Sequence, residues 1–566
     1  MKPAPTSLWH RYRGIAAPYW VSEEKWKAQA FLALLAVLLL TQTGFAVLIN
    51  EQTGEFTSAL AAGDRERFWS AIRWCVLWVC GAVPTYGLYY LVRDRLGNHW
   101  RRWLTFRFLG RYFSQRQFYE LNAQAAIDNP DQRIAEDINT FTQKSLFFGL
   151  ILMGSLIQLT AFSRVLWAIS HELVYFLVLY AIAGTAITLL VFGKPLTLLN
   201  FTQLRREADF RFGLIRVREN AESIALYRGE EPELQQLRQR FASVFDNFNR
   251  LINRQLFLNL FQYGYGMFTL VLPSAIIATH VLSGEMEVGR AVQAAGAFTA
   301  VLSAISLVVD NFESLTRFAA GVDRLDAFYQ SLHPSPPEGR AGSNVVEGTD
   351  NLCLQALDVQ TPQTARTLLR HLSLTVEPGE GLLVVGPSGS GKSALLRTIT
   401  GLWAAGGGRI QRPAAADMLF LPQQPYMLLG GSLRSQLLYP HPQRHFEDAR
   451  LLQALEQVNL PDLVERCGGL GAELDWDRTL SVGEQQRLAF ARLLLTAPRF
   501  AFLDEATSAL DMANEALLYR RLMATRTTPI SVGHRASILK YHAWVLEIQG
   551  EGRWQLIPAQ DYRFHD

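Results

Sequence analysis

RFAFLDEATSALD, residues 499–511, and LSVGEQQRLAFARLLL, residues 480–495, decide the fold of the C-terminal half of the chain. In the first stretch an apolar strand ends in Asp504 and Glu505. In the second, a turn of small residues opens a basic helix. Paired carboxylates at a strand end suit a site where one acid holds a divalent cation and the other polarises water. Taken alone, the pair could also be a solvated sheet edge.

A glycine-rich loop upstream favours a catalytic role for the two acids over a solvent-exposed sheet edge. GPSGSGKS, residues 386–393, matches G-x-x-x-x-G-K-S and lies between an apolar strand and a helix in LTVEPGEGLLVVGPSGSGKSALLRTITGLW. Its glycines let backbone N–H groups face phosphates, and the helix N-terminus adds positive potential. We expect Lys392 to neutralise the β and γ phosphates of ATP and Ser393 to ligate Mg²⁺. The predicted ATP-contacting loop is Gly386, Pro387, Ser388, Gly389, Ser390, Gly391, Lys392, Ser393 and Ala394.

Together these motifs, in this order, resemble an ATP-binding cassette from about Leu352 onward. The resemblance implies that Gln423 in LFLPQQPY senses the γ-phosphate and contacts a membrane domain, and that His534 in SVGHR is a switch histidine on the γ-phosphate. It implies catalytic roles for Glu505, His534 and Lys392, and Mg²⁺ ligation by Ser393, Gln423 and Asp504.

The resemblance also implies residues that act across two copies of the cassette. Ser481, Gly483 and Glu484 would close over ATP bound to the partner chain, and Asp511 would lie in the loop that crosses between cassettes. Val482 replaces the usual first glycine of this turn, but Ser481 and Gly483 remain to make the contacts.

The adenine-stacking position departs from the family pattern. LDVQTPQTAR has Thr361 and Pro362 where an aromatic residue is expected. Adenine selectivity is therefore expected to be weak, so that GTP could compete.

Length and composition predict a membrane half in addition to the cassette. A chain of 566 residues is too long for one core, and its long apolar runs are confined to the region before about residue 310. HPSPPEGRAGSNVVEGTD, residues 333–350, is a Pro- and Gly-rich linker. We expect a polytopic α-helical membrane domain of exporter-like fold at 1–332, this linker, and an α/β P-loop cassette at 351–566. A net charge of +3 and no basic stripe argue against nucleic acid as a partner.

The membrane half contains about six apolar stretches long enough to cross a bilayer. They are residues 28–49, 68–92, 145–170, 172–192, 256–281 and 288–309. The turn at Ser170-His171-Glu172 predicts a tight helical hairpin. Residues 51–67 and 283–288 are expected to be short loops. Lys and Arg are concentrated before the first stretch and between the second and third, which predicts cytoplasmic termini and cytoplasmic polar intervals.

The subfamily follows from further segments. ELDWDRTLSVGEQQR, with Trp476 before the turn, resembles the subfamily of peroxisomal fatty-acyl transporters and their bacterial relatives. PYWVSEEKWKAQ, LINEQTGEFTSALAAGDRERFW, HWRRWLTFRFLGRYF and IDNPDQRIAEDINTF are similar to the SbmA/BacA-like membrane domain, and residues 207–233 resemble its long cytosolic segment. Fused bacterial members are linked to uptake of cobalamin, bleomycin and antimicrobial peptides.

The resemblance implies a homodimeric half-transporter in membrane lipid, in a bacterial inner membrane, that uses ATP and Mg²⁺ to move a small molecule or peptide. An exporter or a lipid or fatty-acyl transporter of the same fold remains an alternative. A different class would be an ATP-gated channel or a regulatory ATPase.

Two features of the membrane half have open interpretations. Phe261, Tyr263, Tyr265 and Phe268 could line a cavity or face lipid and neighbouring helices. Asp310 and Glu313, three residues apart, are expected on one helical face near the cytosolic end of the sixth span. They could face the transport pathway and attract cationic cargo, or they could form a solvated helix end.

Overall fold

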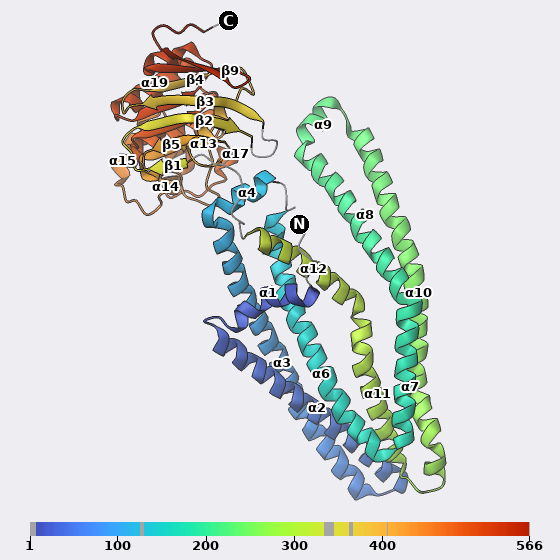
Figure 1. Ribbon diagram of the computed structural model, residues 1–566. Coiled ribbons are helices and arrows are strands. Elements are labelled where there is room, and N and C mark those ends of the chain that lie inside the picture. The colour runs from blue at the N-terminus through green and yellow to red at the C-terminus, as the bar shows by residue number, and fades with distance from the viewer. Residues whose placement is uncertain (1–6, 125–128, 333–343, 362–365, 404–405, 565–566) are drawn as a thin grey trace. The chain divides into compact units, whose positions relative to one another are not determined.

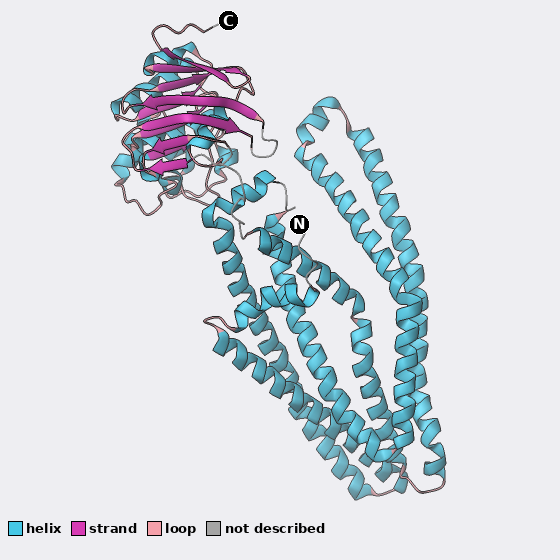
Figure 2. Cartoon of the chain, viewed as in Figure 1, coloured by secondary structure: helices cyan, strands magenta, loops and turns pink. Residues whose placement is uncertain are grey.

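The computed structural model describes the chain except for residues 1–6, 125–128, 333–343, 362–365, 404–405 and 565–566. The chain divides into two compact units, Met1–Pro334 and Ser335–Asp566. The first is helical, and the described strands lie in the second (Figure 2). Most of the predicted linker and the predicted position of Pro362 fall outside the described residues.

The helical unit contains six described helical stretches long and apolar enough to cross a membrane. Its α-helices are α1 (Leu8–Trp20), α2 (Lys25–Ala62), α3 (Arg65–Phe113), α4 (Gln117–Gln124), α5 (Pro130–Gln132), α6 (Ile138–Ile169), α7 (His171–Ile187), α8 (Lys194–Glu219), α9 (Ala221–Tyr227), α10 (Glu230–Leu282), α11 (Val288–Asp310) and α12 (Phe312–Ser331). The six-span prediction is confirmed. α8 and α10 run side by side with α9 at their tip (Figure 1), joined by a buried hydrogen bond from Asn247 to Gln203 of 2.9 Å.

The turns between spans follow local capping chemistry. Ser170 ends the third span in extended backbone and accepts a hydrogen bond from the Leu173 amide, which confirms the predicted hairpin. The prediction of a loop over 51–67 was wrong, because α2 continues to Ala62. Gly63 ends α2 with φ 69°, and Asp64 caps α3. Residues 51–62 continue the helix, although several are polar, because the stretch holds no proline and no helix-ending signal before Gly63.

A seam of small and polar residues joins α2 to α11. A Cβ atom added to Gly289 would lie 1.9 Å from the Gly54 carbonyl oxygen, so the two backbones are in direct contact. Ser58 Oγ accepts a hydrogen bond from the Gly289 amide at 3.0 Å, and Asn50 donates to the Gln293 carbonyl at 3.1 Å. Close approach and interhelical hydrogen bonds of this kind hold helices together where lipid removes the hydrophobic driving force.

The aromatic residues of the fifth span divide between two surroundings. Tyr265 stacks on Tyr180 of α7 with ring centroids 4.2 Å apart, and each hydroxyl donates to the other residue's carbonyl. Phe261 packs against Tyr265. Tyr263 and Phe268 are 73% and 61% exposed. These residues therefore contact a neighbouring helix or lie on the surface of the unit.

The two acids near the end of the sixth span belong to different helices. α11 ends at Asp310, and α12 begins at Phe312 after Asn311. The expectation of one continuous helical face is therefore wrong at the backbone level. The side chains of Asp310 and Glu313 lie outside the described residues, so their part in a transport pathway stays a prediction.

The second unit contains two sheets with helices around them. Its strands are β1 (Asn344–Glu347), β2 (Leu352–Gln360), β3 (Thr367–Val376), β4 (Leu382–Val385), β5 (Arg409–Arg412), β6 (Met418–Leu421), β7 (Phe500–Asp504), β8 (Thr528–Val532), β9 (Trp544–Gly550) and β10 (Arg553–Pro558). The sheet orders are β1-β5-β2-β3 and β10-β9-β4-β8-β7-β6. Its α-helices are α13 (Lys392–Ile399), α14 (Leu433–Leu438), α15 (Asp448–Gln457), α16 (Leu463–Cys467), α17 (Trp476–Thr479), α18 (Val482–Thr496) and α19 (Met512–Ala524).

Strand β7 shows how the six-stranded sheet positions a site. Every residue from Phe500 to Asp504 is buried. Phe500 and Phe502 enter the core that contains α13, whereas Ala501 and Leu503 enter the core that contains α18. This two-residue alternation places a helix layer on each face of the sheet. The strand's carboxyl end therefore delivers two acids to the sheet edge.

A buried hydrogen-bond chain behind the sheet makes the second unit sensitive to acid. Tyr519 donates to Ser531 at 2.9 Å, and the Ser531 hydroxyl lies 2.8 Å from Nε2 of His542. Nδ1 of His542 lies 2.8 Å from the Ile538 carbonyl. With neutral His542, Nδ1–H donates to Ile538 and Nε2 accepts from Ser531, so every hydrogen is used. Burial lowers the pKa of His542 to about 4.

We expect the free energy of unfolding of this unit to decrease as the pH is lowered. The folded pKa lies below the unfolded value, so the unfolded chain binds more protons as the pH falls below about 6.5, and stability is lost through the folded pKa near 4. Between about pH 7 and about pH 5, the loss should be about 2 kcal/mol. Hydrogen exchange of β8 amides in the full chain, corrected for intrinsic rates, measures it. His542→Gln should flatten the dependence, and an equally steep fall in that variant would contradict the assignment.

Candidate nucleotide site

The loop between β4 and α13 is folded around its own lysine. Lys392 Nζ donates to the carbonyl oxygens of Gly386 and Pro387 at 2.8 and 3.0 Å. Gly389 has φ 77°, and a Cβ there would meet no atom within 4 Å, so this part of the loop is open on one side. Ser390 Oγ is buried without a hydrogen-bond partner among the described residues. A lysine, an unpartnered hydroxyl and a helix N-terminus at one open loop fit a bound phosphate chain.

The start of α13 meets the end of β7. Ser393 Oγ donates to the Asp504 carboxylate at 2.9 Å. Burial lowers the pKa of Lys392, and the nearby carboxylates oppose that shift. Burial also raises the pKa of Asp504, against the hydrogen bond from Ser393. A polyphosphate would favour the charged form of Lys392, and a divalent cation would favour the charged form of Asp504. The donors at this corner therefore fit ATP together with Mg²⁺, a cation that prefers oxygen ligands.

Glu505 stands between two residues from neighbouring strands. Gln423 Nε2 donates to one carboxylate oxygen at 3.1 Å, and His534 Nε2 lies 3.4 Å from the other. β6, β7 and β8 are adjacent and parallel, so the residues that follow them meet at one sheet edge. Glu505 itself has φ 48°, a conformation that few non-glycine residues adopt. The sheet thus brings together three residues predicted from separate motifs.

The turn before α18 is organised locally. Ser481 caps α18 and accepts from the Glu484 amide, while the Glu484 carboxylate accepts from the Ser481 amide at 2.9 Å. Burial opposes ionisation of Glu484, but hydrogen bonds from Arg466 and Ser481 outweigh it and lower its pKa. Val482 is 50% exposed. In the described part of the chain, the Ser481 side chain hydrogen-bonds only within its own turn.

Asp511 has an equally local set of contacts. It caps α19 and accepts from the Asn514 amide at 2.7 Å, and this bond lowers its pKa. The loop just before it is held by Arg535, which donates to the Leu510 carbonyl at 2.8 Å. The loop that the sequence assigned to a crossing between cassettes is therefore rigidly attached to its own unit.

Two buried residues of α18 were missed by the sequence reasoning. Gln486 donates to the Gln423 carbonyl at 3.0 Å and accepts from the Ala509 amide at 3.1 Å, which ties the Gln423 loop to α18. Arg492 donates to the Gln436 carbonyl at 2.6 Å and to the Tyr426 carbonyl at 2.8 Å. A lone arginine inside the apolar run AFARLLL was the available signal, because a buried cation needs partners.

Comparisons with known proteins cover both units. Residues 17–282 match the family described as ABC transporter transmembrane region 2, and residues 369–508 match the family described as ABC transporter. An uncharacterized ABC transporter ATP-binding protein of Synechocystis sp. is 46% identical over 555 residues, covering 95% of this chain and 83% of that protein. ABC transporter D family member 2, chloroplastic, of Arabidopsis thaliana is 38% identical, covering 98% and 89%.

Two further comparisons concern transport and fold. The lysosomal cobalamin transporter ABCD4 of Homo sapiens is 30% identical, covering 95% of this chain and 94% of that protein. A solved bacterial Atm1-family ABC exporter with ATP bound superposes with a TM-score of 0.74 at 20% identity, covering 94% of this chain and 96% of that chain. The last likeness concerns the fold alone, and it confirms the predicted exporter-like architecture.

Proposed function

The chain belongs to the ABC transporter family, alongside its D-family half-transporters, and from this premise we propose that two identical copies pair to form one transporter. It is a multi-pass membrane protein whose ATPase activity is coupled to transport. We further propose that ATP is hydrolysed at Glu505, and the observation that carries this is the position of Glu505 between Gln423 and His534, at the sheet edge where Ser393 meets Asp504. This arrangement suits hydrolysis of a terminal phosphate.

We assign each residue of this site a role in ATP binding or hydrolysis. Lys392 would exchange its carbonyl contacts for the β and γ phosphates, and the loop amides would hold the same phosphates. Ser393, Asp504 and Gln423 would hold Mg²⁺, which neutralises charge on the β and γ oxygens. Glu505 would orient and polarise the attacking water, and His534 would bind the γ-phosphate while keeping Glu505 in place. Gln486 acts through Gln423 and is a positioning residue.

Pairing follows from what each copy contains and lacks. One chain has six candidate spans and one nucleotide unit, as expected of a half-transporter. Ser481 is exposed, and its hydrogen bonds in the described part of the copy stay within its own turn. A two-fold arrangement would let Ser481, Gly483 and Glu484 of one copy face ATP on the other, with Asp511 at the crossing loop. Two equivalent sites would result.

Cargo and direction are proposed as uptake of a hydrophilic or amphipathic compound such as cobalamin, a peptide or a bleomycin-like molecule. Two observations support this proposal. The chain is 30% identical in sequence to a lysosomal cobalamin transporter, and its membrane half contains segments that resemble the SbmA/BacA-like membrane domain. The distribution of Lys and Arg around the spans supports cytoplasmic termini in a bacterial inner membrane. An exporter, a lipid or fatty-acyl transporter, an ATP-gated channel and a regulatory ATPase are the competing outcomes.

Reconstitution in sealed liposomes separates these outcomes. Wild-type protein is expected to concentrate labelled cobalamin, or a labelled peptide, against its gradient when ATP and Mg²⁺ are supplied on the cassette side. Glu505→Gln is the matched control and should abolish accumulation. Movement in the opposite direction would indicate an exporter, and dissipation without accumulation would indicate a channel. ATP hydrolysis without movement of any tested cargo, lipids included, would favour a regulatory ATPase.

A further inference from the structure

A basic groove lies along the exposed face of α1, outside the nucleotide site. Its volume is about 920 Å³, and it is lined by residues spaced three and four apart on α1, together with Trp103 and Arg107 of α3. The opposite face of α1, with Ile15 and Tyr19, is buried in the core of the helical unit. The groove therefore runs along a helix that is firmly attached on one side and open on the other.

The groove's arginines differ from their neighbours in charge pairing. Arg11 pairs with Asp323 at 2.9 Å, and Arg102 pairs with Glu24 at 3.0 Å. Among the described residues, no carboxylate lies within ion-pair distance of the two groove arginines. These two are Arg13, which is exposed on α1, and Arg107, whose guanidinium lies over the Trp103 ring at 5.2 Å from its centroid.

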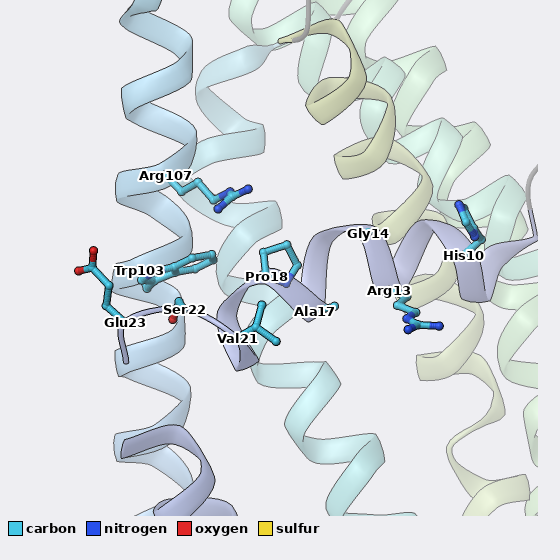
Figure 3. Close-up of a pocket in the computed structure, with 10 residues that line it drawn as sticks. All are labelled: His10, Arg13, Gly14, Ala17, Pro18, Val21, Ser22, Glu23, Trp103 and Arg107. Atoms are coloured by element: carbon cyan, nitrogen blue, oxygen red, sulfur yellow. The ribbon is translucent and has the colours of Figure 1, made fainter. Parts of the chain in front are cut away.

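Arg107 also has unused hydrogen-bonding capacity. Its Nε is buried without a partner in the described part of the chain, and its one side-chain hydrogen bond there is a long contact to Tyr329 of 3.4 Å. Figure 3 shows Arg107 and Trp103 extending from α3 toward α1, with the Trp103 ring beside Pro18. The groove's one acid, Glu23, lies in this view on the other side of α3 from the Arg107 guanidinium. The groove is therefore cationic and fits an anion.

The groove's position indicates which anion it meets. α2, the first candidate span, begins five residues after α1 ends. Trp9 and Trp26 flank the groove on either side along the chain and are 68% and 74% exposed, and Val21 inside it is 74% exposed. Exposed tryptophans beside lysines and arginines at the end of a span are typical of the membrane–water interface. A helix with one buried face and such residues on its other side suits contact with lipid headgroups.

We propose that this groove is a binding site for the phosphate headgroup of an anionic phospholipid, with Arg13 and Arg107 as its charge-recognising residues and Trp103 as its floor. The inference goes beyond ATP-driven transport and does not depend on it. The chemistry is that of a basic pocket at the membrane surface, where each arginine contributes to headgroup affinity. Trp9 and Trp26 would lie among the acyl-chain ends nearest the headgroups.

Native mass spectrometry of the full chain tests this site without using activity. Detergent-solubilised protein receives equal amounts of phosphatidylglycerol and phosphatidylcholine, and the bound lipids are counted. Wild type should retain phosphatidylglycerol preferentially. Arg13→Gln alone should weaken that binding about 5-fold, and Arg13→Gln with Arg107→Gln about 10- to 30-fold. Arg13 is exposed and, among the described residues, its side chain has no hydrogen-bond or ion-pair partner to lose, so the single variant should fold normally.

The controls separate a lipid site from general charge and from free phosphate. Arg218→Gln with Arg238→Gln removes the same charge from exposed positions on α8 and α10 and should leave lipid retention unchanged. Millimolar inorganic phosphate should not displace the lipid. Wild-type retention in the Arg13 and Arg107 variants would overturn the proposal. Equal loss in the Arg218 and Arg238 variant, or displacement by inorganic phosphate, would overturn it too.

Discussion

Glu505→Gln should lower kcat for ATP hydrolysis by about 10²- to 10⁴-fold while ATP affinity stays near the wild-type value. The carboxylate lies between Gln423 and His534, and the amide preserves its shape while removing the negative charge that polarises water. Lys392 and the loop that we propose binds phosphate are untouched. Two such copies should therefore bind ATP and remain paired for much longer than wild type.

Steady-state hydrolysis and equilibrium ATP binding, measured on the same detergent-solubilised preparation, separate the two effects. Glu551→Gln is a suitable control because that carboxylate is exposed and forms a surface ion pair with Arg553 across 3.6 Å. It should hydrolyse ATP at the wild-type rate. Near-wild-type turnover in Glu505→Gln would remove Glu505 from its proposed role as the residue that polarises water.

Lys392→Ala should have the second large effect, this time on ATP binding. Lys392 is buried within the loop, where its amine donates to the Gly386 and Pro387 carbonyls, and we propose that its charge would there meet two phosphate groups. Losing charge-assisted hydrogen bonds worth about 1.5–3 kcal/mol in total should weaken ATP binding by about 10- to 150-fold. Isothermal titration with ATP and Mg²⁺ measures this. Lys540→Ala, an exposed lysine of the same unit, should bind ATP as wild type does, and equal affinities in both variants would refute the assignment.

Much of the fold could be predicted from the sequence because its signals are local. The six spans follow from apolar length, and the helical hairpin follows from the turn at Ser170. The end of α2 did not follow, because the polar residues after Ile49 read as a loop, although nothing in them stops a helix before Gly63. The break at Asn311 was also missed, since no proline or glycine marks it.

The nucleotide site was predictable for a different reason. Lys392 and Ser393 lie within one motif, whereas Gln423, Glu505 and His534 come from three motifs whose meeting depends on strand order. The family resemblance supplied that order in advance. Gln486 escaped notice because its side-chain hydrogen bonds reach loops that lie far from it in the sequence. Its importance is visible only once α18 is packed against the sheet.

The most direct test of the central claim, that ATP is hydrolysed at sites shared between two copies, uses dimers purified with two different tags. In the trans dimer one chain carries Lys392→Ala and the other carries Ser481→Arg, which leaves one shared site intact. In the cis dimer one chain carries both changes and its partner is wild type, which damages both shared sites. We expect the trans dimer to hydrolyse ATP at up to about half the wild-type rate and the cis dimer to be nearly inactive. Greater activity in the cis dimer than in the trans dimer would contradict the account, because it would mean that each copy holds a complete site of its own.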